Sequence, residues 1–266
     1  MDREEHILRY QEAQCLGPRT DYVATEEALE IRVEGELLSV AMRTPGQDEE
    51  LAAGWLLSEG IISRASDIAE IIARPGDDPR AGMVDVLLHD RAGFDAARHR
   101  RAAVANASCG VCGAASLEQA LKSFPKIENA FLISASVLPL LPERLTAAQA
   151  TFRRTGGLHA CGLFDGEGNL VALREDVGRH NALDKLLGWA LREGRLPLSE
   201  SVLLLSGRVS FEMAQKALAA GVPVIVALGA PSSLAIDAAR HGDQTLVAFL
   251  RGQAFNVYSG EKRLRS

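Results

Sequence analysis

The sequence contains few cysteines, few aromatic residues and no long hydrophobic stretch. Cysteine occurs 4 times in 266 residues, and aromatic residues make up 5% of the chain. So few cysteines exclude the disulfide-rich scaffold of a small secreted protein. No run of about 18 or more apolar residues predicts a transmembrane helix, and the charged start of the chain, from Met1 to His6, is unlike a secretory signal. These absences predict a cytoplasmic protein without a membrane partner.

The charge balance and the overall composition exclude two further classes. The formal net charge is -6 and the isoelectric point is about 5.6, so the molecule as a whole is not a nucleic-acid binder. Hydrophobic residues make up 47% and charged residues 24%, which is ordinary for a globular protein and excludes a disordered chain. At about 150 residues per domain, the length predicts one large domain or two smaller ones.

Composition and hydrophobic periodicity divide the chain into four segments. Residues 1–20 are polar and predict a flexible lead-in, and residues 21–101 predict a small α+β domain. Residues 102–145 hold a Cys-x-x-Cys loop, a helix and a connector, and residues 146–266 predict an α/β domain. In the α+β segment, Glu34-Gly35 predicts a hairpin turn. The expected strands there are 30–33, 37–40, 68–72 and 83–88, and the expected helix runs from Asp48 to Gly60.

The second half of the chain alternates predicted strands and helices. Several of its strands are continuous apolar runs, which are typical of a sheet with helices covering both faces. We therefore predict a mostly parallel sheet with helices on both faces. The expected strands are 158–164, 170–175, 202–206, 222–228 and 245–251, and the expected helices are 116–122, 146–154, 181–193, 211–220 and 233–241.

The motif with the clearest chemistry is Cys109-Gly110-Val111-Cys112-Gly113. Its glycines tolerate the tight turn that would bring two thiols together or onto one metal ion. The positive end of the helix predicted after the motif favours the thiolate form of Cys112 and of Cys109. Such a thiolate can attack a donor persulfide, and the second thiol can then expel the sulfur by forming a disulfide.

Structural zinc and inert packing are the alternatives to reactive thiol chemistry at this motif. A zinc knuckle needs four ligands, and the chain has no second Cys-x-x-Cys pair. Cys15, Cys161 or scattered histidines would have to complete the site without the usual spacing. We therefore expect thiol chemistry and no bound metal.

Polar residues gather where predicted strands of the second half begin and end. His159 ends the run Gly156-Gly157-Leu158-His159, and Arg179 lies at a helix start directly after a strand that ends in charged residues. Loops at the carboxyl ends of parallel strands line ligand crevices. An arginine at a helix start favours an anion such as phosphate. The alternative is a solvated helix cap with Asp176 as the capping residue.

Two further turns offer hydroxyls and backbone N–H groups without bulk, as an anion site requires. Their candidate residues are Ser206, Arg208, Gly229 and Ser232. After the last long strand, an aromatic residue and an arginine near a glycine are suited to a guanine-like base. The alternatives are plain strand-to-helix turns and an edge strand with a solvated arginine. The candidate residues of this last segment are Phe249, Leu250, Arg251, Gly252, Gln253 and Ala254.

Five motifs together point to a known family. They are Ser108-Cys-Gly-Val-Cys-Gly113, Thr155-Gly-Gly-Leu-His159, Glu175-Asp-Val-Gly-Arg-His-Asn-Ala-Leu-Asp-Lys185, Ser206-Gly-Arg-Val-Ser-Phe-Glu-Met213 and Ala230-Pro-Ser-Ser233. With them the chain resembles the formate dehydrogenase accessory sulfurtransferase family, of the FdhD/NarQ type. The resemblance runs from about Tyr22 to the C-terminus.

The resemblance implies a cytoplasmic sulfurtransferase that carries sulfur. It would receive sulfur from a cysteine desulfurase and pass it to the molybdenum (or tungsten) bis-pterin guanine dinucleotide cofactor of formate dehydrogenase. Cys109 would bear the persulfide, Cys112 would be the second thiol, and the segment from Phe249 to Ala254 would bind the cofactor, with GDP as a mimic. The resemblance also implies a homodimer and a cytidine-deaminase-like fold. Many relatives have Lys where this chain has Ala114, which removes one cation that would stabilise the thiolate.

Two rival functions come from other classes. One is a non-catalytic chaperone that only binds the cofactor or formate dehydrogenase. The other is a zinc-dependent nucleoside deaminase, which needs His-x-Glu followed by Pro-Cys-x-x-Cys. Here His159-Ala160-Cys161 lacks the glutamate, and the Cys-x-x-Cys pair precedes the histidine. The sequence therefore disfavours zinc deamination.

Overall fold

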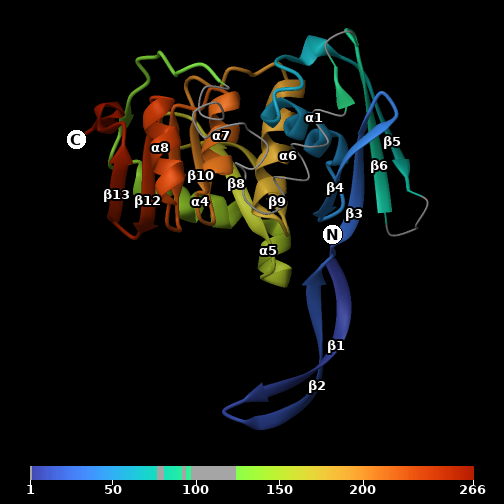
Figure 1. The fold of residues 1–266 in the computed structure, drawn as a ribbon. Coiled ribbons are helices and arrows are strands. Elements are labelled where there is room, and N and C mark those ends of the chain that lie inside the picture. The colour runs from blue at the N-terminus through green and yellow to red at the C-terminus, as the bar shows by residue number, and fades with distance from the viewer. Residues whose placement is uncertain (1, 77–80, 92–93, 97–123) are drawn as a thin grey trace.

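The computed structural model describes residues 2–76, 81–91, 94–96 and 124–266. Figure 1 shows a body built from two sheets with helices between them, and a two-stranded ribbon that projects from the body. Cys109, Cys112, Ala114 and the predicted helix at 116–122 lie outside the described residues.

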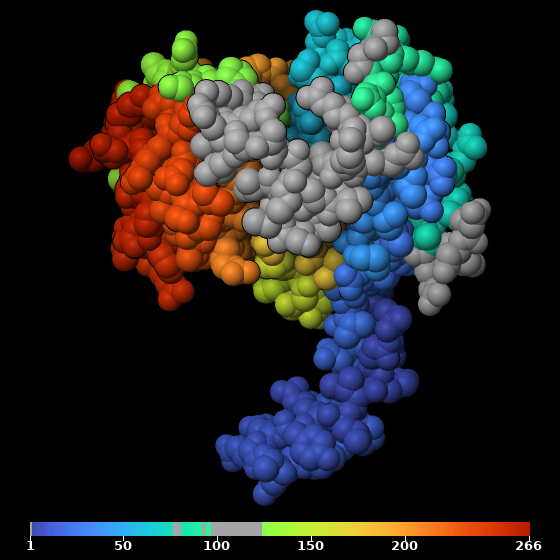
Figure 2. All heavy atoms as spheres, in the orientation of Figure 1, coloured from blue at the N-terminus to red at the C-terminus, as the bar shows by residue number. Residues whose placement is uncertain are grey.

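The N-terminal segment forms a hairpin. β1 (Asp2–Gln11) pairs antiparallel with β2 (Gln14–Ala24). Glu12 and Ala13 form the connecting turn, and both have positive φ, as in the two-residue turns whose twist matches that of the strands. Such turns usually contain Asn and Gly, so the residue types of Glu12 and Ala13 do not predict a hairpin turn. The sequence analysis expected a flexible lead-in at residues 1–20 and did not anticipate this pair of strands. Figure 2 shows the ribbon extending away from the body.

A four-stranded sheet of order β4-β3-β6-β5 follows, with one helix on it. Leu29, Ile31 and Val33 alternate along β3 and are fully buried toward that helix. The predicted turn at Glu34-Gly35 is confirmed, since both residues have positive φ between paired strands. The elements are β3 (Glu27–Val33), β4 (Glu36–Arg43), α1 (Asp48–Ser58), β5 (Ile68–Pro75) and β6 (Ala81–Leu88).

The C-terminal half contains a six-stranded sheet of order β13-β12-β11-β10-β8-β9. Its strands are β8 (His159–Phe164), β9 (Leu170–Asp176), β10 (Val202–Leu205), β11 (Val224–Ala227), β12 (Thr245–Arg251) and β13 (Ala254–Ser259). Its long helices are α6 (Arg179–Arg192), α7 (Phe211–Ala219) and α8 (Ser233–His241). A short pair, β7 (Ile133–Ser134) and β14 (Leu264–Arg265), lies apart from this sheet.

This sheet is mixed, so the prediction of a mostly parallel sheet is wrong. The pairs β10–β11 and β11–β12 are parallel, whereas β8–β9, β8–β10 and β12–β13 are antiparallel. Apolar runs indicate that both faces are covered but say nothing about strand direction. A short turn decides the direction of β12 and β13, because Gly252-Gln253 between them is too short for the crossover that parallel pairing requires. β13 itself lies outside the predicted strands.

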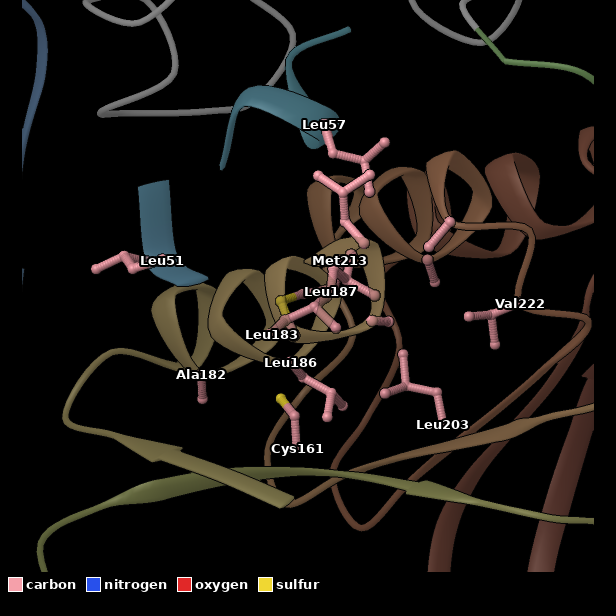
Figure 3. Packing of buried hydrophobic residues seen from close by; sticks show 14 of the residues in the cluster. Leu51, Leu57, Cys161, Ala182, Leu183, Leu186, Leu187, Leu203, Met213 and Val222 are labelled. Atoms are coloured by element: carbon pink, nitrogen blue, oxygen red, sulfur yellow. The ribbon is translucent and has the colours of Figure 1, made fainter. Parts of the chain in front are cut away.

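Helices cover both faces of the sheet, as predicted. Leu203 and Leu205 of β10 pack in one hydrophobic cluster with α6, α7 and α8, whereas Val202 and Leu204 pack in another with α4. Figure 3 shows part of the first cluster, in which side chains from α6, α7, β8 and β10 meet. Those labelled in that region include Leu183, Leu186, Leu187, Met213, Cys161 and Leu203.

The helix predicted for 146–154 is two helices, α4 (Leu141–Ala148) and α5 (Ala150–Thr155). Gln149 separates them because its ψ of 91° is extended. The carboxylate of Glu175 accepts hydrogen bonds from two backbone N–H groups of α5, at 3.1 and 2.8 Å. A side chain distant in sequence thus stabilises the second helix start.

The two sheets are joined by a close crossing of α1 and α6. An ideal Cβ at Gly54 would lie 1.8 Å from the backbone oxygen of Asp184, and one at Gly188 would lie 1.8 Å from that of Glu50. The helices therefore touch backbone to backbone, which only glycine allows. One hydrophobic cluster extends from Leu29 of the first sheet to β12 of the second.

We predict that Gly188→Ala lowers the free energy of unfolding by about 3 kcal/mol, because the added methyl group forces the two helices apart. Urea unfolding followed by circular dichroism measures the change. Gly157→Ala is the matched control, since the nearest atom to its Cβ would lie 3.6 Å away. Equal unfolding midpoints for the two variants would contradict the prediction.

Candidate functional site

Three parallel strands end at one edge of the six-stranded sheet, and the turns that follow are held together by backbone hydrogen bonds. Gly229 N–H donates to Gly207 O at 3.1 Å, and Phe249 N–H donates to Gly229 O at 3.2 Å. β8 runs antiparallel to β10, so its first residue, His159, lies at the same edge. We call this region the strand-end site. It consists of His159, Arg179, His180, residues 206–210, residues 228–233 and Phe249.

The glycines of the site are required by close contacts. A Cβ at Gly229 would lie 2.8 Å from Gly207 O and 2.9 Å from Arg208 N, so any side chain there would separate the two turns. A Cβ at Gly207 would lie 3.4 Å from the ring of His159. The small residues noted in the sequence therefore bring the backbone N–H groups of two turns next to an imidazole.

Three helices begin at the strand-end site. α6 starts at Arg179, α7 follows Ser210, and α8 follows Ser232. Each serine caps its helix, because its side chain accepts a hydrogen bond from a backbone N–H of the first turn. The positive ends of three helices thus lie at one edge, and that arrangement favours an anionic ligand.

Arg179 supplies the cation of the site. It stands at the first position of α6, and its Cδ would lie 3.8 Å from a Cβ at Gly207. Its Nε is buried and has no hydrogen-bond partner among the described residues. A guanidinium N–H that is shielded from water without a partner is costly, and a bound phosphate or carboxylate would satisfy it.

Two neutral imidazoles lie beside this guanidinium. The Nδ1 of His159 is 3.5 Å from Ser206 Oγ, and the Nε2 of His180 is 3.3 Å from Ser210 Oγ. Burial lowers the pKa of His159, and the nearby charge of Arg179 lowers it further. Burial likewise lowers the pKa of His180 to about 4, although Glu212, 3.5 Å away, opposes the change. Both rings are therefore neutral at neutral pH, and the unprotonated nitrogen of each can accept a hydrogen bond.

Most of the predicted binding residues lie at this edge, but they differ in how far they are exposed to solvent. His159, Arg179, Ser206 and Gly229 lie together, while Arg208 and Ser232 are exposed at its rim. Phe249 is 38% exposed and has a positive φ of 55°, which is strained for an aromatic residue. Leu250 is buried in the cluster that contains α4, so its side chain serves packing. The remaining four are exposed: Gly252 and Gln253 form the turn between β12 and β13, and Arg251 and Ala254 are the paired strand residues on either side of it.

The sequence analysis missed two buried ion pairs behind the site. Lys185 Nζ is 2.7 Å from the Asp176 carboxylate, and both side chains are inaccessible to solvent. Lys216 Nζ on α7 is 2.9 Å from both carboxylate oxygens of Asp184 on α6. Asp176 and Lys185 also bond Thr44, at the end of β4. The sequence shows that the motif from Glu175 to Lys185 contains charged residues. Only the fold shows that Asp176 and Lys185 pair with each other and hold the junction between β9 and α6.

The two cysteines that the structure describes, Cys161 and Cys15, differ in their exposure. Cys161 is buried in the main hydrophobic cluster, and burial raises the pKa of its thiol far above neutral pH. Its Sγ lies 3.9 Å from the backbone oxygen of Arg179. Cys15 is exposed on β2. The predicted sulfur-carrying residues, Cys109 and Cys112, lie outside the described residues.

Two features are absent from the described ranges. Among those residues, no three His, Cys, Asp or Glu side chains cluster as metal ligands would. No helix in the same part of the chain combines the length and the hydrophobicity that crossing a membrane requires.

The fold and the site define a mixed α/β protein with an anion-favouring edge formed by strand ends and helix starts. The FdhD/NarQ family model matches residues 24–265. The chain belongs to this family.

Individual relatives agree with the family match. The chain is 47% identical over 250 residues to the "Sulfur carrier protein FdhD" of Nocardia farcinica, covering 93% of this chain and 90% of the relative. It is 43% identical over 266 residues to the protein of that name from Mycobacterium tuberculosis, covering 97% and 96%. A crystal structure from Desulfotalea psychrophila, described as that of a formate dehydrogenase accessory protein, superposes with a TM-score of 0.80 at 25% identity and covers 99% of each chain.

We predict that stability falls as the pH is lowered from about 6.5 to about 4, because the unfolded chain binds protons on histidine that the folded chain does not. The pKa of His180 is lowered from 6.5 to about 4 in the fold, and that of His159 is lowered as well. The His180 side chain is 30% exposed, so we expect a loss of roughly 2 kcal/mol by about pH 4.5. Urea unfolding at several pH values measures it.

His180→Gln is the variant that isolates this effect. It should flatten the pH dependence between about pH 6.5 and about pH 4.5, where histidine titrates and most carboxylates do not. An unchanged slope in the variant would show that other groups cause the loss.

Proposed function

We propose that this chain carries sulfur to a molybdenum or tungsten cofactor for formate dehydrogenase. It would accept sulfur as a persulfide on Cys109 from a cysteine desulfurase and pass it to the bis-pterin guanine dinucleotide form of the cofactor. The observation that carries this proposal is the family match over residues 24–265, together with the name of the relatives, sulfur carrier protein. The match includes the Cys109-x-x-Cys112 motif.

The strand-end site is suited to the nucleotide part of such a cofactor. A guanine dinucleotide carries phosphates, and Arg179, the helix starts and the turn N–H groups supply a cation and hydrogen-bond donors. His159, Ser206, Arg208, Gly229 and Ser232 complete the proposed phosphate contacts. Phe249, exposed at the same edge, would stack on the base, with the turn from Arg251 to Ala254 beside it.

The proposed sulfur transfer consists of two nucleophilic attacks by thiolates. The Cys109 thiolate attacks the outer sulfur of the desulfurase persulfide, which leaves a desulfurase thiolate and a persulfide on Cys109. Cys112 then attacks the inner sulfur of that persulfide, a disulfide forms between Cys109 and Cys112, and the outer sulfur leaves as hydrosulfide for the metal. Two electrons pass from the thiols to the departing sulfur, so a thiol reductant must restore the pair.

Other parts of the proposal come from the family alone. They include a cytoplasmic location, a homodimer and formate dehydrogenase as the client. The deaminase-like description of the six-stranded layer likewise stays a prediction. A chaperone that only binds the cofactor is the second candidate, because the strand-end site by itself explains binding without sulfur transfer. Cys109→Ala separates the two: it should abolish the activation of formate dehydrogenase but leave cofactor binding unchanged.

Persulfide formation is tested by mass spectrometry of the full chain after incubation with a cysteine desulfurase and cysteine. We expect a gain of about 32 Da, one sulfur atom, on the peptide that contains Cys109 and Cys112. Cys109→Ala should abolish the gain, and Cys15→Ala is the control that should keep it. A chain that gains sulfur only at Cys15, or nowhere, would refute the carrier function.

Nucleotide binding is tested by thermal unfolding with GDP. If GDP binds with a Kd of about 10 µM, about 1 mM GDP adds about 2.7 kcal/mol of stability, which corresponds to a rise in Tm of about 5 °C or more. Arg179→Gln should remove most of that rise, because it deletes a charge-assisted contact with phosphate. Arg240→Gln, on the exposed end of α8, should keep it. An equal GDP-dependent rise in Tm in both variants would show that the nucleotide binds at a site other than the strand-end site.

A further inference from the structure

His180 links the strand-end site to α7 through one of its two ring nitrogens. It follows Arg179 on α6, and its Nε2 is 3.3 Å from Ser210 Oγ and 3.5 Å from Glu212 Oε2. A carboxylate accepts hydrogen bonds and donates none, so it favours the ring tautomer that carries its proton on Nε2. The other nitrogen, Nδ1, makes neither contact. A second proton on this ring therefore binds at Nδ1.

Glu212 is held between this imidazole and a buried ion pair. Its other carboxylate oxygen, Oε1, is 3.6 Å from Lys216 Nζ, one turn further along α7. Lys216 is paired more closely with Asp184 of α6, at 2.9 Å from both carboxylate oxygens, and both of these side chains are buried. Because Asp184 balances the charge of Lys216, the charge of Glu212 is available to a cation at His180.

The charges at the site leave room for a proton when an anion binds. Arg179 supplies one positive charge, Glu212 supplies one negative charge, and burial and Arg179 keep His159 and His180 neutral. Arg208, at the rim, is exposed, so solvent screens its charge. A diphosphate brings two negative charges, which meet one guanidinium and the partial charges of the helix starts. The bound anion therefore raises the proton affinity of a neutral base beside it.

His180 is better placed than His159 to gain this proton. The polar contact of the His159 ring is a hydroxyl, Ser206 Oγ at 3.5 Å, and the charge acting on the ring is that of Arg179. His180 has the carboxylate of Glu212 beside it, which stabilises an imidazolium. Glu212 raises the pKa of His180, whereas burial and three other groups lower it, and these groups are Arg179, Lys216 and His159. Because each imidazolium disfavours the other, one proton is expected and not two.

We propose that His180 takes up one proton from solvent, on Nδ1, when the strand-end site binds a diphosphate diester, and that Glu212 is the counter-ion of the resulting imidazolium. The ring then donates from Nε2 toward Glu212 and from Nδ1 toward the anion. In the free site the same ring stays neutral. This inference rests on the proposed function, because it needs an anion at the strand-end site, and it makes His180 a residue that recognises the charge of the ligand.

Isothermal titration calorimetry of the full chain with GDP-mannose tests the proton uptake. Both phosphates of this probe are diesters, so it lacks the ionisation near about pH 6 that a phosphate monoester has. The wild type should bind about 10-fold more tightly at about pH 5.5 than at about pH 8, because the complex binds a proton that the free chain does not. At about pH 6, titrations in two buffers of different ionisation enthalpy should show an uptake of more than about half a proton per complex.

Four variants assign the proton to its residue. His180→Gln should lose the 10-fold gain at about pH 5.5, and Glu212→Gln should reduce it to about 3-fold or less, because the imidazolium loses its counter-ion. His159→Gln should keep the gain, whatever its effect on affinity. His89→Gln, at an exposed position after β6, is the matched control and should keep both the affinity and the gain. Circular dichroism at each pH shows whether the variants are folded.

The possible failures differ from one another. A wild type that binds GDP-mannose equally tightly at both pH values would overturn the proton uptake and leave the nucleotide site standing. A gain that survives in folded His180→Gln, or that is lost in His159→Gln, would overturn the assignment to His180. A wild type that does not bind GDP-mannose at either pH would overturn the anion site on which the inference rests. Persulfide formation on Cys109 is measured separately, so a failure of sulfur transfer is distinguishable from each of these.

Discussion

The backbone contact between α1 and α6 at Gly54 and Gly188 is the constraint on which the rest of the structure depends. Because α1 and α6 pack directly on each other, they connect the four-stranded sheet to the six-stranded sheet. A single hydrophobic cluster therefore contains residues of both sheets. The buried pair of Asp184 and Lys216 lies next to this contact, and Ser58 of α1 donates a hydrogen bond to the same carboxylate. Such a pair stabilises little in itself, but loss of one partner leaves a buried charge. The pair therefore favours one arrangement of the three helices α1, α6 and α7.

The geometry of the strand-end site depends on how α6 is held by its neighbours. Asp176 and Lys185 fix the junction between β9 and α6, and through Thr44 they tie it to the four-stranded sheet. Arg179 is thereby held at the edge where β10 and β11 end. Arg179 stands at the first position of α6, and its buried Nε lacks a partner in the described part of the chain, an arrangement suited to a preorganised anion site. The glycines at 207 and 229 add backbone donors without occupying the space that a ligand needs.

Much of this fold was predictable from local patterns. The hairpin at Glu34-Gly35, the helix from Asp48 and the strand-helix alternation after Gly157 agree with the structure because period and turn residues act within a few positions. The direction of the strands, the division of 146–154 at Gln149 and the N-terminal hairpin were not predictable in this way. They depend on turn length, on a carboxylate from Glu175 and on the Glu12-Ala13 turn, none of which has a pattern of its own.

The features of the candidate site also separate into those that the sequence contains and those that only the tertiary structure decides. The sequence by itself determined which residue types stand close together along the chain: a pair of cysteines at 109 and 112, small residues at strand ends, and an arginine at a helix start. Thiol chemistry at Cys109 and Cys112 is a prediction from that residue type and short spacing. The tertiary structure decided that Arg179, His159 and Gly207 meet, that His180 is kept neutral, and that Leu250 and Cys161 are packed away from solvent. Those outcomes depend on burial and on contacts between residues far apart in the chain, which a linear pattern does not contain.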